Sequence, residues 1–281
     1  MKEGEQSKNR GFVKEMEIGK VLENREKWMN IKVEKSYHIC MSEESKNNLE
    51  ETRELLDENE KLNLMVYSNH IAFEDPWIIG SAIYKIDPKA KRHWIVPTFY
   101  SRTGLGLKSS MLKIMCIPAK LCEVETIRVI QAHEVKEDAK RKKSKYKPGE
   151  VSKNYRQFLT RFNELGNNLQ PTAVLIFPEG HRSDDGKLQK DKVTDGMLTI
   201  AKKLGDTIFV DIAISYDEKF HRGLPLNFGK SLTLTVGKPY LYKKGEGEKD
   251  INFYMNKLAK NLPEGMRGEY AQMPEIRETK V

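Results

Sequence analysis

A histidine and an aspartate stand five positions apart in "SNHIAFEDPW", residues 68–77. An imidazole that is held by a carboxylate at one nitrogen can take a proton at the other, so His70 and Asp75 are candidates for a general base and its orienting partner. Five steps along a regular α-helix turn a side chain by about 500°, which would leave the two groups about 140° apart. The pair can therefore act together only if a turn separates them.

The residues around the pair predict such a turn. "LNLMVY" (62–67) is typical of a buried strand, and Asp75 followed by Pro76 is typical of a helix start, with the aspartate as N-cap. We therefore expect residues 69–74 to form a strand-to-helix connection that folds His70 back onto Asp75. The helix N-terminus beside them would favour developing negative charge.

The spacing alone is weak evidence for a catalytic pair. With six histidines and twelve aspartates in the chain, about 0.26 pairs of this spacing are expected by chance. His133 and Asp138 repeat the spacing within a charged run, and we interpret them as a solvated surface. A structural histidine at a strand end remains the alternative for His70.

A second segment, "AVLIFPEGHRS" (173–183), places charged groups at the end of another buried strand. Ligands of open α/β sheets bind at the carboxyl ends of the strands, so Glu179, Gly180 and Arg182 are candidates for substrate contacts. The guanidinium of Arg182 suits a phosphate, which it can bind through two parallel hydrogen bonds. The alternative is a tight turn at Gly180 with a surface ion pair beside it.

Taken together, the two segments resemble the glycerolipid acyltransferase family, the glycerol-3-phosphate and lysophosphatidic acid acyltransferases. Members carry Asn-His, four residues and Asp, and later Phe-Pro-Glu-Gly-Thr-Arg-Ser; this chain has "NHIAFEDP" and then "FPEGHRS". The likeness extends over residues 62–242. His181 stands where the family usually has threonine, and Ala72 where a hydroxyl residue is common, which puts the acceptor in doubt more than the reaction.

The resemblance implies an O-acyltransferase that moves a fatty acyl group from acyl-CoA or acyl-ACP to a hydroxyl of a glycerophosphate-type acceptor. Glycerol-3-phosphate and 1-acylglycerol-3-phosphate are such acceptors. His70 would be the general base and Asp75 its partner. Lys120 in "MCIPAKL" falls where the family has an acceptor-binding arginine, and Arg102 is a further phosphate candidate. The expected substrate-binding residues are thus Glu179, Gly180, Arg182, Lys120 and Arg102.

Two other functions fit the same residues. Water in place of the acceptor would make the protein a thioester or ester hydrolase, although the chain has no G-x-S-x-G motif. A basic module that binds lipid surfaces or carrier proteins, without catalysis, is the other. We expect no metal and no cofactor beyond the acyl thioester, because no metal-ligand spacing, dinucleotide motif or Walker loop is present.

Short apolar runs that alternate with helical patterns predict an α/β fold, with a mostly buried central sheet flanked by helices on both faces. We expect a small N-terminal segment of helix and strand over 1–60, with a strand at 31–39, and the acyltransferase domain over 61–281. The expected helices of that domain span 76–86, 104–114, 151–166, 195–204 and 249–262.

The net charge of +8 favours anionic partners, and the basic segment 139–147 could rest on an anionic membrane surface or bind an acyl carrier protein. No nucleic-acid-binding motif accompanies it, so we expect no nucleic acid partner. The N-terminus lacks an apolar signal core, the three cysteines are scattered, and no apolar run reaches the roughly 20 residues of a spanning helix. We therefore expect a cytoplasmic protein, peripheral on the membrane at most.

Overall fold

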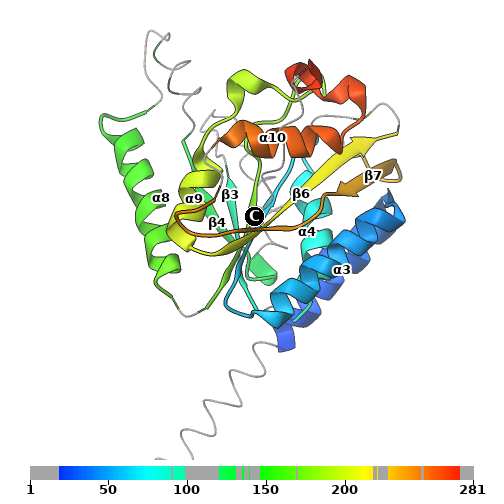
Figure 1. Ribbon diagram of the computed structural model, residues 1–281, viewed down its shortest axis with the longest axis horizontal. Helices are drawn as coiled ribbons and strands as arrows, with labels where there is room; N and C mark the ends of the chain where they lie inside the picture. The colour runs from blue at the N-terminus through cyan, green and yellow to red at the C-terminus, as the bar shows by residue number, and fades with distance from the viewer. Residues whose placement is uncertain are drawn as a thin grey trace, which may run out of the picture.

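One mixed sheet of eight strands organises the described part of the chain (Figure 1). The computed structural model describes residues 19–89, 91–98, 120–130, 135, 139, 146–168, 170–217, 220, 227–247 and 250–272. The strand order is β1-β7-β6-β2-β5-β3-β4, and β8 pairs with β6. The strands are β1 (His38–Cys40), β2 (Asn63–Tyr67), β3 (His93–Thr98), β4 (Glu125–Arg128), β5 (Thr172–Ile176), β6 (Thr207–Tyr216), β7 (Ser231–Val236) and β8 (Tyr240–Tyr242).

The centre of the sheet is parallel. Strand β2 lies between β5 and β6 and runs parallel to both, so that Tyr67 is in register with Ile176 on one side and Asp211 on the other. Every residue of β2 and β5 is buried, which requires cover on both faces of the sheet. The carboxyl ends of these three strands therefore lie at one edge, where the two candidate segments begin.

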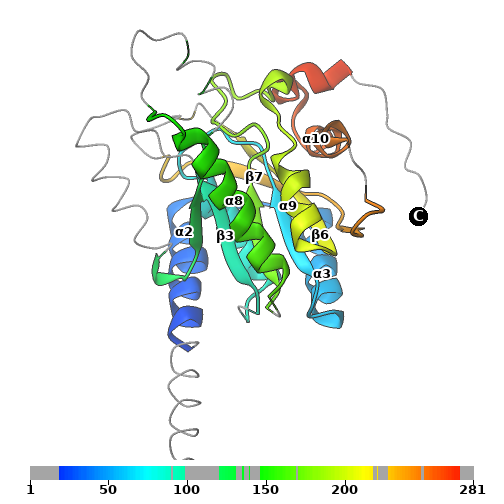
Figure 2. The same cartoon turned by 90° about the vertical axis from the view of Figure 1, so that its left-hand side faces the viewer.

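Helices cover both faces of the sheet, as the sequence predicts (Figures 1 and 2). One apolar core joins the sheet to α2 (Lys32–Ser36), α3 (Glu43–Glu58) and α4 (Asp75–Ile86). The other joins it to α8 (Glu150–Gly166), α9 (Gly196–Leu204) and α10 (Ile251–Lys260). Short helical turns are η1 (Glu26–Ile31), η2 (Lys190–Lys192), η3 (Glu264–Met266) and η4 (Gly268–Gln272).

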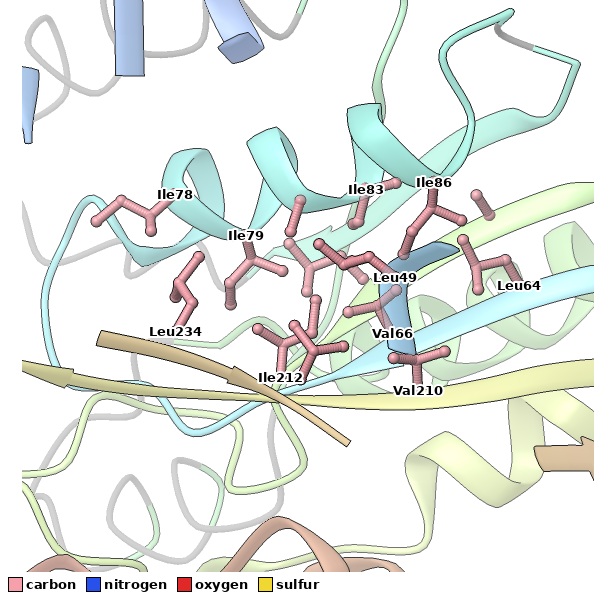
Figure 3. Packing of buried hydrophobic residues seen from close by; sticks show 14 of the residues in the cluster. Leu49, Leu64, Val66, Ile78, Ile79, Ile83, Ile86, Val210, Ile212 and Leu234 are labelled. Carbon is pink, nitrogen blue, oxygen red and sulfur yellow. The ribbon is translucent and has the colours of Figure 1, made fainter. Parts of the chain in front are cut away.

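Helix α4 shows how the sequence fixes this packing. Pro76 stands in its first turn, where a missing N–H costs nothing, and its apolar residues recur at helical spacing. Ile79 is fully buried and faces Val66 and Ile212 of the sheet (Figure 3). Burying one such side chain contributes about 1.5–3 kcal/mol. This contact holds the helix that carries Asp75 against the strand that leads to His70.

Most predicted helices are confirmed within a few residues, and one strand is wrong. The chain is helical through η1 and α2, so only the last part of the expected 31–39 strand is extended, as β1. Val33 and Tyr37 are four positions apart and both buried, whereas Ile31 is exposed. Because that spacing suits a helix, the apparent alternation misled the prediction. The expected helix 104–114 lies outside the described residues.

The N-terminal segment contributes to the same sheet as the rest of the chain. Strand β1 pairs with β7 in parallel, and α3 contacts α4 and β7. Ser42 caps α3 by accepting the backbone N–H of Ser45 at 3.1 Å. Because β1 and β7 belong to one sheet, residues 38–40 share a sheet with the rest of the chain. A domain boundary near residue 60 stays a prediction.

Gly166→Ala is expected to destabilise the protein by about 1–3 kcal/mol, because a Cβ there would lie 2.0 Å from the backbone oxygen of Lys203 in α9. Gly196→Ala is the matched control, since its nearest neighbour, the Thr194 Oγ1 atom, lies at 3.6 Å. Urea unfolding of both variants measures the difference. Equal stability of the two would contradict the close packing of α8 on α9.

Candidate active site

The structure brings His70 and Asp75 together across a turn. Nδ1 of His70 lies 2.9 Å from Oδ2 of Asp75, and the same oxygen accepts the backbone N–H of Ile71 at 2.6 Å and of Ala72 at 2.8 Å. The Asp75 side chain is fully buried and that of His70 is 17% exposed. A carboxylate can only accept, so Nδ1 carries the proton, and in the neutral imidazole Nε2 has the lone pair.

Asn69 fixes the position of this turn on the sheet. Its Nδ2 donates to the Ile214 carbonyl and its Oδ1 accepts the Ile214 N–H, both at 2.9 Å. The amide thus continues the pairing of β2 with β6 beyond the last strand residue. His70 follows directly, so its backbone is anchored to the central sheet.

The helix start differs from the prediction in one respect. Glu74, and not Asp75, is the N-cap residue of α4, and its backbone carbonyl accepts the N–H groups of Trp77 and Ile78. The Asp75 carboxylate turns back toward His70 because three donors surround it there. The expected N-cap role of Asp75 is therefore wrong, whereas the expected turn between His70 and Asp75 is present.

The second segment meets the first at three points. The backbone N–H of Ser183 donates to the His70 carbonyl at 2.7 Å, and the ring of Phe177 stacks on the imidazole with centroids 4.2 Å apart and planes 22° apart. The backbone N–H of His70 also lies near the Glu179 carboxyl group and lowers its pKa. Strands β2 and β5 are neighbours, so these contacts follow from the sheet order.

Glu179 lies inside this contact and is only 1% exposed. Its Oε1 accepts the backbone N–H of Gln189 at 2.7 Å. Burial raises the pKa of Glu179 to about 7, and the backbone N–H groups of Gln189 and His70 offset part of that rise. This carboxyl group joins residues 179 and 189 across their loop, and its contact with an acceptor stays a prediction.

Gly180 and Arg182 occupy the loop between these anchors. Gly180 has φ of 71°, a left-handed conformation that favours glycine, and its N–H donates to the Phe177 carbonyl at 2.8 Å. Arg182 is partly exposed, and its guanidinium carbon lies 5.3 Å from the centroid of the Phe73 ring. That ring follows His70 closely in sequence, so the cation lies over the same turn as the histidine.

Comparisons with known proteins leave the family open. No family model matches the chain, and no curated protein matches it. Among solved structures, the chain is similar to the 1-acyl-sn-glycerophosphate (LPA) acyltransferase PlsC from Thermotoga maritima, at 15% identity and a TM-score of 0.44. That match covers 83% of this chain and 74% of that one.

Of the two remaining predicted site residues, the structure describes Lys120. Lys120 is exposed, and the next two residues, Leu121 and Cys122, offer their carbonyls to Asn24 and Arg25 of the N-terminal helix. Among the described residues, no hydrogen bond or ion pair joins Lys120 to the candidate site. Arg102 lies outside the described residues.

Two further groups near the site were not identified from the sequence. The Tyr216 hydroxyl lies 3.5 Å from Oδ1 of Asp75, and the Glu74 Oε1 accepts both the backbone and side-chain N–H groups of Asn227, at 2.8 and 2.6 Å. Tyr216 is the last residue of β6, and Asn227 follows that strand in the chain. Only the pairing of β6 with β2 brings them near, and no local pattern reveals it.

The described residues contain no group of three or more His, Cys, Asp or Glu side chains placed to hold a metal ion. Within the same part of the chain, no helix has both the length and the apolar character needed to span a bilayer.

Glu179→Gln is expected to remove a pH dependence of stability. The folded protein binds the Glu179 proton more tightly than the unfolded chain, so the stability that it contributes is present below pH 4.5 and lost as the pH rises through about 7. The loss is of the order of 3 kcal/mol in the wild type. Urea unfolding at pH 5 and pH 8 measures it, and the exposed Glu246→Gln is the control. Identical pH dependence in both variants would contradict the burial argument.

Proposed function

We propose that the protein is an O-acyltransferase that uses an acyl thioester, acyl-CoA or acyl-ACP, and a hydroxyl of a glycerophosphate-type acceptor. The observation that carries the proposal is the His70 imidazole, held at Nδ1 by a buried carboxylate and partly exposed, beside the loop that bears Arg182. The order of the two motifs, which resembles the glycerolipid acyltransferases, supports the same function. Oriented imidazoles of this kind act as general bases.

In the proposed reaction, Nε2 of His70 takes the proton of the acceptor hydroxyl as its oxygen attacks the thioester carbonyl carbon. The tetrahedral intermediate then loses the thiolate, which receives the proton from the imidazolium. Asp75 orients the ring and stabilises its charged form. The acceptor oxygen takes the place of an enzyme nucleophile, so no acyl-enzyme forms.

The oxyanion of that intermediate needs hydrogen-bond donors. The backbone N–H groups at the start of α4 are the expected donors, but those of Trp77 and Ile78 donate to the Glu74 carbonyl and those of Ile71 and Ala72 to Asp75. These four groups are therefore occupied. We infer that the oxyanion accepts its hydrogen bond from a group other than these four.

We assign the acceptor phosphate to Arg182, whose fork of donors matches phosphate oxygens. Arg182→Lys keeps the charge but loses the paired hydrogen bonds, so the KM for a phosphorylated acceptor is expected to rise about tenfold with little change in kcat. Arg53→Lys, at a partly exposed position on α3, is the control. A KM that is unchanged in Arg182→Lys would remove the phosphate role.

One assay tests the function itself: purified protein with a labelled long-chain acyl-CoA and, separately, acyl-ACP, and a panel of glycerol-3-phosphate, 1-acylglycerol-3-phosphate and an unphosphorylated monoacylglycerol. Acceptor-dependent ester formation supports the proposal. Free fatty acid formed equally fast without acceptor would select a hydrolase. Absence of turnover with every donor and acceptor would favour the binding module.

The basic segment 139–147 is proposed to meet an acidic carrier protein or anionic lipid. Of its cations, Lys147 is described, and it lines a surface hollow along α8 with Lys153, Arg156 and Arg161. Cations near an anionic bilayer contribute about 1 kcal/mol each. Comparing acyl-ACP with acyl-CoA, and adding anionic vesicles at low and high salt, separates the two partners in the same assay.

A further inference from the structure

The His70 imidazole is supported on a face as well as on an edge. The hydrogen bond to Asp75 fixes Nδ1 but permits the ring to tilt about the line that joins the two groups. The Phe177 ring lies nearly parallel to the imidazole, with centroids 4.2 Å apart. A second ring at this distance occupies the space into which the imidazole would tilt.

Phe177 is itself held firmly. Ile176, the residue before it, is in register with Tyr67, and its carbonyl accepts the N–H of Ser68 at 3.1 Å. The Phe177 carbonyl accepts the Gly180 N–H, and the Phe177 ring packs against the core that contains α4. The two stacked rings therefore come from adjacent strand ends, and their spacing is set by the central sheet.

The stacked ring also has an electrostatic effect on the reaction. The face of an aromatic ring is negative, so it attracts a cation placed above it. In the proposed mechanism the imidazole is neutral before the reaction and positively charged as the acceptor proton arrives. The attraction is thus larger in the transition state than in the resting enzyme, and it lowers the barrier without tightening substrate binding.

We propose that Phe177 is a positioning residue that orients the His70 ring and stabilises its charged form, an inference that rests on the proposed acyl transfer. An aliphatic side chain would fill the space without the negative face. Phe177→Leu is therefore expected to lower kcat about 3- to 10-fold with KM unchanged. Phe177→Tyr keeps an aromatic face and is expected to have the wild-type kcat. Phe253→Leu, an aromatic residue of α10 outside the site, should leave kcat at the wild-type value.

A spectroscopic measurement tests the stack without relying on activity. The ring current of Phe177 is expected to shift the His70 imidazole proton resonances upfield in wild type and in Phe177→Tyr, and Phe177→Leu should move them downfield. Wild-type resonances in Phe177→Leu would overturn the proposal. If the stack is seen but the wild type transfers no acyl group, the proposed function fails on its own.

Pentafluorophenylalanine at position 177 covers the case in which the leucine variant does not fold. Its ring keeps the shape of phenylalanine but reverses the sign of the charge on its face. A fall in kcat at unchanged KM supports the proposal. Wild-type kcat with this ring would overturn the electrostatic part, and wild-type kcat in a folded Phe177→Leu would overturn the whole.

Discussion

Replacing His70 by alanine is expected to lower kcat for acyl transfer by about 10²- to 10⁴-fold, because the proton acceptor is lost. The protein should stay folded. Its His70 side chain is partly exposed, and Asp75 keeps the backbone N–H groups of Ile71 and Ala72 as donors. Initial rates with saturating donor and acceptor, beside circular dichroism and thermal unfolding, measure both effects.

His93 provides a matched control for this substitution. Its Nε2 lies 2.6 Å from Oε2 of Glu125, and its side chain is 30% exposed, so it too is a partly exposed histidine with a carboxylate partner. It begins β3, whereas His70 follows the end of β2. His93→Ala should keep wild-type kcat. If His70→Ala were as active as His93→Ala, the general-base role would have to be abandoned.

Asp75→Asn is expected to cost a similar factor, roughly 10²- to 10⁴-fold in kcat, although the shape of the side chain is kept. The amide is neutral, so it cannot stabilise the imidazolium. With the amide oxygen in the place of Oδ2, the three donors keep their acceptor, and the NH₂ group replaces Oδ1 beside the Tyr216 hydroxyl. The pH dependence of kcat/KM and the thermal midpoint should be measured on the same preparation.

Asp75→Ala separates the chemical from the structural contribution of this residue. It leaves the buried N–H groups of Ile71 and Ala72 without their acceptor, which costs roughly 1–3 kcal/mol for each group. The alanine variant should therefore have both a lowered kcat and a lowered stability, whereas the asparagine variant should have a lowered kcat and a stability close to that of the wild type. Full activity in Asp75→Asn would show that the carboxylate does not orient the base.

The fold class could be predicted because strands such as Leu64–Val66 and Val174–Ile176 are continuous apolar runs, which are typical of strands buried on both faces. Strand order could not be predicted, since it depends on contacts between residues more than 100 positions apart. Strand β4 was not predicted, because Glu125 and Arg128 are two charged residues among its four and leave no apolar run. Residues 31–36 fit both periods, and packing of Val33 decides for the helix.

The candidate site also has one part that the local sequence predicts and another part that only the strand order explains. Pro76 after Asp75 predicts the turn that separates the histidine from the aspartate, because a proline at a helix start is a local signal. The contacts of His70 with Phe177 and Ser183 were not predicted, and the adjacency of β2 and β5 explains them. Nothing local marks Tyr216 or Asn227, which reach the site through β6 and the segment after it.

The Asn69 amide, which joins the turn to β6, has a consequence for protein engineering. It fixes the turn between His70 and Asp75 to β6, and the chain enters that turn directly from β2, so two adjacent strands of the central sheet hold the candidate residues in place. Substitutions at Arg182, in the loop assigned to the acceptor, should therefore change which acceptor is chosen before they change the reaction. Laboratory evolution toward new acceptors is best begun in that loop, with the strand ends left as they are.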